Sequence, residues 1–207
     1  MHLLIQDYPE AIYAAFLLSE KYGTNCVQTE IDYMLGWIKE WEKFGLVVVP
    51  SNHNDWLDKW VRLGQGAKDI KNAFIFNKFR NTLFQEEAPK GLVAKVIDDV
   101  FSKTVKTLHR NDSFKVKGYE LNNHGDLGAN GAKGTSTTFK KLNVKIVSGD
   151  KHFAYSLDGA HGVGISTVKN HGYNRGLSSW VQSHGVINGN GKFQHLLYSN
   201  NKFTKLI

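Results

Sequence analysis

The chain has 207 residues and a hydrophobic fraction of 41%, enough for the core of one large domain or two small ones, and we expect one. It carries 26 Lys and Arg against 19 Asp and Glu, and the resulting net charge of +7 fits a polyanionic partner such as nucleic acid. The single cysteine, Cys26, excludes an internal disulfide framework and suits a reducing cytoplasm. No apolar run approaches the ~20 residues that cross a bilayer, so we expect a cytoplasmic protein without a membrane partner.

Helices dominate the first half of the predicted structure. Apolar residues at helical spacing predict helices over residues 9–22, 29–44, 56–63, 69–84 and 92–108. We expect Thr29 to cap the second helix and Gly45 to end it. The apolar face of the fourth includes Ile70, Phe74 and Leu83. The β-branched run over 46–49 predicts a parallel strand that is buried on both faces.

The second half changes character. It consists of short strand-like segments separated by glycines, at residues 114–121, 144–147, 162–166, 180–187, 193–198 and 203–207. A brief helix is expected over 135–142. Helices with one parallel strand, followed by a β-rich half, predict an α/β protein in which packed sheets are flanked by helices.

Three polar clusters each follow an apolar run, at residues 51–55, 122–126 and 149–152. Such clusters are expected at strand ends, where α/β proteins build their sites. Their candidate side chains are, in chain order, Asn52, His53, His124, Asp150 and His152. Nitrogen and oxygen donors of this kind suit a divalent transition metal such as Mn, Fe or Zn. Asp150 and His152 are two positions apart, so in an extended segment both point to the same side.

Each cluster also has a plain structural interpretation. Residues 51–55 and 149–152 are good turn sequences. The glycine-rich stretch after His124 is either a phosphate loop to which Lys133 supplies charge, or a surface loop. Further on, Arg175 is a candidate to pair with phosphate, and Trp180 either stacks on a base or belongs to the core.

Taken together and in order, these clusters resemble the calcineurin-like metallophosphoesterase superfamily. That family's pattern runs Asp-x-His, Gly-Asp, Gly-Asn-His-Asp/Glu, a lone His and Gly-His-x-His. The last three blocks correspond to residues 51–54, His124 and residues 149–152. The match is closer to a branch found in tailed bacteriophages, with a His-Gly-Asp-x-Gly-x-Asn-Gly-x-x-Gly stretch at 124–134 and a Tyr-Asn-x-Gly-x-Ser-Ser-Trp stretch at 173–180.

The resemblance implies an α/β/β/α sandwich with two divalent metal ions, of which Mn²⁺ is expected and Mg²⁺, Fe²⁺ or Zn²⁺ are alternatives. A metal-activated water would attack phosphorus in line. The resemblance implies that Asn52, His124 and His152 are metal ligands and that His53 protonates the leaving group. We expect Asp150 to be a further ligand and Asp55 to be the catalytic carboxylate beside His53. The residues expected to bind the substrate are Lys133, Arg175 and Trp180.

The first two blocks of the family pattern are missing. Residues 1–45 are expected to be helical and divergent, and Asp7, which has neither a preceding strand nor the glycine, is left unassigned. The strand at 46–49 would then lack a neighbour on one side, and the sandwich would be incomplete at its N-terminal side. Three explanations remain open: a partner chain supplies the missing ligands, the chain is a degenerate paralogue kept for assembly, or its N-terminus provides unusual ligands.

The sequence therefore predicts a single metallophosphoesterase-like domain over residues 1–207. It would act as a phage DNase, or as the C-terminal portion or subunit of one, in the host cytoplasm. The expected partners are DNA or another phosphoester and either a partner chain or a second copy of this chain. The alternatives are a non-catalytic assembly or DNA-binding subunit with a degenerate metal site, and a phosphomonoesterase acting on nucleotides.

Overall fold

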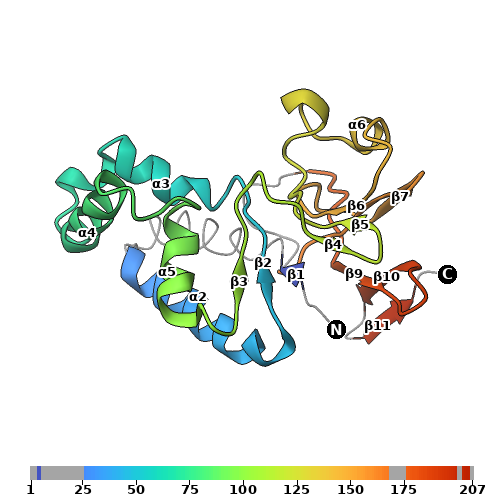
Figure 1. Cartoon of the computed structure of the whole chain (residues 1–207), viewed down its shortest axis with the longest axis horizontal. Helices are drawn as coiled ribbons and strands as arrows, with labels where there is room; N and C mark the ends of the chain where they lie inside the picture. The colour runs from blue at the N-terminus through green and yellow to red at the C-terminus, as the bar shows by residue number, and fades with distance from the viewer. Residues whose placement is uncertain (1–3, 6–25, 168–175, 200–201, 206–207) are drawn as a thin grey trace. The chain divides into compact units, whose positions relative to one another are not determined.

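The computed structural model of the chain describes residues 4–5, 26–167, 176–199 and 202–205. These residues belong to two units, Met1–Arg110 and Asn111–Ile207, each of which is described by itself (Figure 1). Both units combine helices with β-strands, so the predicted α/β class is confirmed. That the chain is a single domain stays a prediction. Within the described residues, no helix has the length and apolarity that a membrane span requires.

A small parallel sheet forms the strand layer of the first unit. It contains β1 (Leu4–Ile5), β2 (Val47–Val48) and β3 (Lys106–Thr107), with β2 in the middle and parallel to both neighbours. The predicted parallel strand is confirmed, but two expectations are wrong: β2 has a neighbour on each side, and a strand does end shortly before Asp7. A strand of two residues is too short to produce a hydrophobic pattern, which is why β1 was not predicted from the sequence.

Helices surround this sheet in the first unit. They are α2 (Val27–Trp41), η1 (Glu42–Phe44), α3 (Asp55–Arg62), η2 (Gln65–Lys68), α4 (Ala73–Phe84) and α5 (Leu92–Phe101). Met34 and Ile38 of α2 pack with Ile97 and Phe101 of α5 around Leu46 at the start of the β2 segment. The predicted helix over 9–22 lies outside the described residues.

Two predicted helix boundaries are wrong. Thr29 lies inside α2, whose N-cap is Cys26, because the first free N–H of the helix, that of Val27, donates instead to the buried Asn72 side chain at 2.8 Å. A tertiary partner thus replaces the local cap that the sequence favours. The segment expected to be helical up to residue 108 is α5 followed by β3.

The apolar face assigned to the fourth predicted helix is also wrong in part. Ile70 precedes α4 and is 93% exposed, and Phe74 in its first turn is 84% exposed. The buried face of α4 consists of Ile75, Phe76 and Phe79 instead. Ile70 and Phe74 follow the helical spacing, but both side chains are exposed to solvent.

The second unit is built on a five-stranded sheet of order β4-β5-β6-β8-β7. Its strands are β4 (Lys115–Val116), β5 (Tyr119–Glu120), β6 (Lys145–Ser148), β7 (Tyr155–Leu157) and β8 (Ala160–Gly162). The run over 114–121, predicted as one strand, is a hairpin that turns at Lys117 and Gly118, both of positive φ. The predicted short helix is α6 (Ser136–Lys140), and its Phe139 packs on Ile146 and Ala160.

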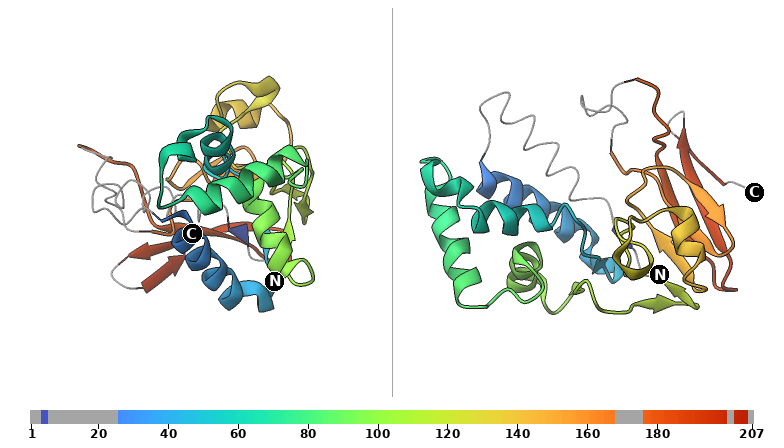
Figure 2. Two further views of the ribbon diagram at one scale, coloured as in Figure 1. Left: turned by 90° about the vertical axis from the view of Figure 1, so that its left-hand side faces the viewer. Right: turned by 90° about the horizontal axis from the view of Figure 1, so that it is seen from above.

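A second, antiparallel sheet completes this unit (Figure 2). It has the order β11-β10-β9, with β9 (Ser183–Ile187), β10 (Phe193–Ser199) and β11 (Lys202–Lys205). The two sheets are joined through Gly164, whose N–H donates to the Ser183 hydroxyl at 2.7 Å, and through Phe193, whose ring stacks on that of His161.

Candidate functional site

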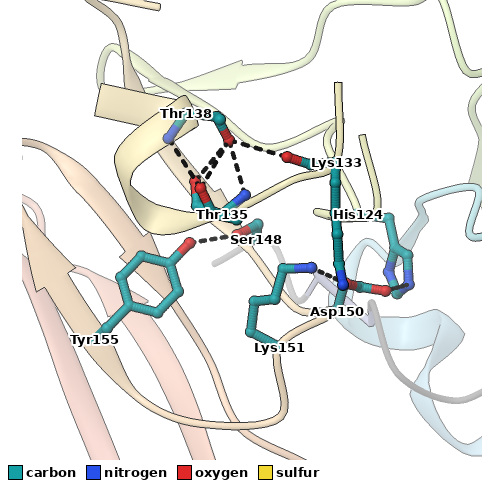
Figure 3. A network of polar contacts seen from close by, with 8 residues as sticks. All are labelled: His124, Lys133, Thr135, Thr138, Ser148, Asp150, Lys151 and Tyr155. Carbon is teal, nitrogen blue, oxygen red and sulfur yellow. Dashed lines mark hydrogen bonds and ion pairs between the residues drawn. The ribbon is translucent and has the colours of Figure 1, made fainter. Parts of the chain in front are cut away.

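The side chains of His124 and Asp150 meet at one edge of the five-stranded sheet. β5 and β6 are parallel neighbours, so the chain leaves both at the same edge, and the two residues follow these strands. The backbone N–H groups of Gly149 and Asp150 both donate to the carbonyl oxygen of His124, at 2.8 and 2.9 Å. The His124 side chain is only 1% exposed, and its Nε2 lies 3.4 Å from Asp150 Oδ1 (Figure 3). The prediction that two polar clusters adjoin at strand ends is confirmed for this pair.

Two glycines allow this close approach. Gly125 has a φ of +114°, and a Cβ there would lie 3.1 Å from the Cβ atoms of Ser148 and Asp150. A Cβ on Gly134 would lie 1.9 Å from the carbonyl oxygen of Gly125. The loop between them folds back on itself, because Gly134 N–H donates to Asp126 O at 2.9 Å. Side chains at either glycine would therefore push the loop off the strand ends.

Lys133 lies on that loop and is exposed. Residues 127 and 133 form an isolated antiparallel bridge, and η3 (Ala129–Gly131) forms the tip between them. At the base of the loop the Thr138 hydroxyl lies 3.4 Å from the carbonyl oxygen of Lys133 (Figure 3). The loop is thus a defined, closed structure that carries a cationic side chain beside the His124 segment.

The carboxylate of Asp150 is held by two partners. Its Oδ1 faces His124, and its Oδ2 accepts a hydrogen bond from the Lys151 ammonium at 2.5 Å. Burial by itself raises the pKa of this carboxyl, but the contacts with His124 and Lys151 outweigh that effect and hold the pKa well below its usual value. Asp150 is therefore ionised, as a metal ligand must be. Lys151 was not among the predicted site residues, although it lies inside the same polar cluster.

The spacing of His124 and Asp150 fits a shared cation. A charge-assisted N–H···O bond is about 2.7 to 2.9 Å long, and the 3.4 Å between Nε2 and Oδ1 is longer. Two ligand atoms at adjacent positions around an ion, each about 2.1 Å from it, are about 3.0 to 3.4 Å apart. In the described part of the chain, no three His, Cys, Asp or Glu side chains gather into a group able to hold a metal ion. A metal ion at this pair would therefore require further ligands, and the role of His124 and Asp150 as ligands stays a prediction.

Residues 149–152 form a turn rather than an extended segment. The N–H of His152 donates to Gly149 O at 3.2 Å, and His152 has a φ of +61°. The argument that Asp150 and His152 point to the same side because the segment is extended is therefore wrong. The His152 ring packs edge-on against Trp180, with ring centroids 4.2 Å apart, and His152 O accepts from Val181 N–H. Trp180 is half-buried, and its contact is with a predicted metal ligand. Arg175 lies outside the described residues.

The first polar cluster lies in the other unit, directly after β2. Residues 52–54 form a turn in which Ser51 Oγ donates to Asn54 Oδ1 at 3.1 Å. His53 is half-buried. The side-chain oxygen of Asn52 is buried and accepts no hydrogen bond from any residue that the structure describes. A buried amide oxygen in that condition suits a cation ligand. The turn interpretation is thus correct, and the role of Asn52 as a metal ligand stays a prediction.

Asp55 begins α3 and pairs with Arg110. Its Oδ2 lies 2.9 Å from Nη2 of that arginine, and the aspartate side chain is 43% exposed. The partner that the structure gives to the carboxylate is therefore a guanidinium. The catalytic role of Asp55 beside His53 stays a prediction.

Two supporting groups were not found from the sequence. Glu120 Oε1 accepts from three backbone N–H groups, those of Phe114, Leu121 and Asn122, and thereby fixes the segment that leads to His124. On the other side, the Ser148 hydroxyl and the Tyr155 hydroxyl lie 3.0 Å apart (Figure 3), and burial raises the pKa of Tyr155. Glu120, Ser148 and Tyr155 belong to no recognisable sequence motif, so there was no reason to select them from the sequence.

Comparison with known proteins links the chain to bacteriophages. It is 31% identical over 165 residues to Protein A1 of Escherichia phage T5, a name that states no activity. The matched stretch makes up 76% of this chain and 30% of the phage protein, so the match spans less than a third of that relative. No protein-family model matches the chain, and no solved structure does. The phage relationship is thus confirmed, whereas membership of the metallophosphoesterase superfamily stays a prediction.

Proposed function

We propose that this chain is part of a metal-dependent phosphodiesterase that hydrolyses DNA in the cytoplasm of an infected bacterium. One observation carries the proposal: a buried histidine and an ionised aspartate meet at the ends of two parallel strands, at a distance that fits a shared cation. Imidazole with carboxylate is a donor set that suits Mn²⁺ and similar ions.

Two divalent ions, with Mn²⁺ the expected one, would polarise the phosphoryl oxygens and lower the pKa of a bound water. His124 and Asp150 hold the metal, and His152, packed against Trp180, is a further ligand. Asn52 offers its buried side-chain oxygen, and His53 donates a proton to the leaving oxygen. Lys133, Arg175 and Trp180 bind the substrate. The α/β/β/α sandwich implied by the family resemblance is part of the same proposal.

The similarity to a phage protein and the net charge of +7 support a role with DNA. Because no three His, Cys, Asp or Glu side chains of the described residues gather around one ion, we further propose that a partner chain, or a second copy of this one, supplies the remaining ligands. A phosphodiesterase that lacks part of its ligand set binds metal weakly and gains activity when the partner is added.

A second candidate function rests on Lys151. Its ammonium occupies one oxygen of Asp150, and a cation so placed neutralises the carboxylate without a metal. The alternative is therefore a non-catalytic DNA-binding or assembly subunit in which Lys151 has taken the place of the ion.

Cleavage assays separate the two functions. The purified chain is incubated with plasmid DNA and with bis(p-nitrophenyl) phosphate, in Mn²⁺ or in EDTA, alone and with the candidate partner chain. The phosphodiesterase predicts cleavage that needs Mn²⁺ and is lost in His124→Ala but kept in His184→Ala, a change at an exposed histidine on β9. DNA binding with no cleavage under any of these conditions would establish the binding subunit instead. Release of phosphate from nucleotides alone would point to a phosphomonoesterase.

A further inference from the structure

A cavity of about 500 Å³ opens on the helical part of the first unit, and residues 51–55 of the first polar cluster are not in its described lining. Residues of α3, η2 and α4 line it, together with Gly64 and Glu86, and α3 and α4 are neighbours in Figure 1. Its floor is apolar and buried, with Val61 and Phe76 only 4% and 2% exposed. The Phe76 ring is held edge-on by Trp60, with centroids 5.2 Å apart. The cavity thus has a volume that suits one small organic group.

Its rim is cationic and aromatic. Arg62 of α3 and Arg80 of α4 line it, and both are exposed. The charge of Arg62 also acts on the Asp58 carboxylate of the same helix. Phe84, at the end of α4, lines it as well and leaves 87% of its surface exposed. Glu86 is the carboxylate that the described lining contains. An exposed ring beside two guanidiniums matches the two parts of a nucleotide, a flat base and an anionic phosphate.

We infer that this cavity holds one unpaired nucleotide of a single-stranded DNA segment, with its base against Phe84 and its flanking phosphates on Arg62 and Arg80. A base inside a duplex is already stacked on both faces and is not available to the ring, so the site favours single strands. The inference goes beyond the proposed catalysis, because this contact needs no metal and none of the residues proposed as ligands.

The surroundings agree with a strand rather than a free nucleotide. Four large apolar side chains between residues 63 and 84 are strongly exposed, namely Leu63, Ile70, Phe74 and Phe84. Exposed lysines on the same segments, Lys59, Lys68, Lys71 and Lys78, add positive charge along it. Exposed apolar and cationic side chains on the same segments suit a polymer of bases and phosphates that continues past the cavity.

Fluorescence anisotropy with a labelled oligothymidylate of twelve nucleotides, measured in EDTA, tests the inference on the full chain. Phe84→Ala is expected to weaken binding about fivefold to a hundredfold, the range for loss of one base–ring contact, with little effect on the salt dependence. Arg62→Ala/Arg80→Ala is expected to weaken it at least about tenfold and to flatten the plot of log Kd against log salt, because two phosphate contacts are lost. Glu86→Gln is expected to tighten it, since a like charge is removed from the phosphate.

Lys103→Ala/Lys115→Ala removes the same charge at exposed positions outside the cavity and is expected to weaken binding less than the arginine pair does. Circular dichroism verifies that each variant is folded. Wild-type affinity in Phe84→Ala, or equal losses in the arginine and lysine pairs, would overturn the inference. So would equal affinity for duplex DNA, or full competition by thymidine monophosphate at the same base concentration. Since no metal is present, a failure here leaves the Mn²⁺-dependent cleavage assay unaffected.

Discussion

His124 and Asp150 come within 3.4 Å of each other because their strands, β5 and β6, are parallel neighbours that end at one edge of the sheet. Their contact is fixed by the backbone as well, since two N–H groups of the Asp150 turn donate to the carbonyl oxygen of His124. A histidine that is 1% exposed and an ionised carboxylate are therefore held together before any ligand arrives. Such preorganisation is what a metal centre requires of its protein.

We expect Lys151 to compete with a metal ion for Asp150, because its ammonium donates to the carboxylate. Lys151→Met removes the ammonium from Oδ2 and keeps the apolar stem, so the carboxylate becomes fully available. We expect the affinity for Mn²⁺ to rise by up to about tenfold, the effect of one partly buried charge pair. Isothermal titration calorimetry measures the change. A weaker affinity in this variant would mean that Lys151 supports the site instead of competing for it.

Gly134 is required for the loop after His124 to close. A Cβ at this position would lie 1.9 Å from the Gly125 carbonyl oxygen, so Gly134→Ala is expected to lower the free energy of unfolding by about 3 kcal/mol or more. Gly189→Ala is the matched control, because no atom lies within 4 Å of a Cβ there. It is expected to change stability by less than about 0.5 kcal/mol. Urea unfolding of both variants gives the comparison, and equal stabilities would refute this role of Gly134.

Glu120 makes stability depend on pH in the acid range. Burial by itself raises its pKa, but the hydrogen bonds from Ser113, Phe114, Asn122 and Leu121 bring the pKa below the ordinary value of 4.5. Its contribution to the free energy of unfolding is therefore complete above about pH 4.5 and is lost as the pH falls through the folded-state pKa. Glu120→Gln is expected to lower the free energy of unfolding by about 1 to 2 kcal/mol at pH 7 and to reduce its dependence on pH in the acid range. Urea unfolding between pH 7 and pH 3 tests it, and an unchanged slope would contradict it.

Asp58 is expected to behave in the opposite sense. Its Oδ2 accepts from the N–H of Leu92 at 3.0 Å, at the start of α5, while burial raises its pKa. The cost of ionising it is therefore complete above the folded-state pKa and is relieved as the pH falls through that value. Asp58→Asn keeps an acceptor without a charge and is expected to stay within about 0.5 kcal/mol of the wild type at pH 7, whereas Asp58→Ala loses about 1 to 2 kcal/mol. Equal losses in the two variants, measured by thermal unfolding, would show that the charge and not the hydrogen bond matters.

The sequence predicted the parts of the fold that are encoded locally. The β-branched run around Val47 and Val48 predicted a parallel strand, and the brief helix expected over 135–142 is present as α6. The polar residues after strands were also placed correctly, because strand ends follow from the hydrophobic pattern. The pair His124 and Asp150 could therefore be expected, although its distance could not.

The features that depend on distant parts of the chain were missed. β1 is two residues long and exists because β2 offers it a parallel edge. The hairpin at Lys117 and Gly118 interrupts a run that looked continuous, since a lysine of positive φ leaves no trace in composition. The partner of Asp55, Arg110, likewise results from a tertiary contact. Propensity and pattern carry no information on such contacts.

Electron paramagnetic resonance of Mn²⁺ titrated into the purified chain tests most directly whether His124 and Asp150 hold a metal. We expect the free-ion signal to fall as the wild-type chain and His184→Ala bind the ion, and binding to weaken at least about tenfold in His124→Ala and in Asp150→Asn. Circular dichroism confirms that both site variants keep their fold. Equal Mn²⁺ binding by the wild type and these two variants, or none by a folded wild-type chain with or without its candidate partner, would contradict the account.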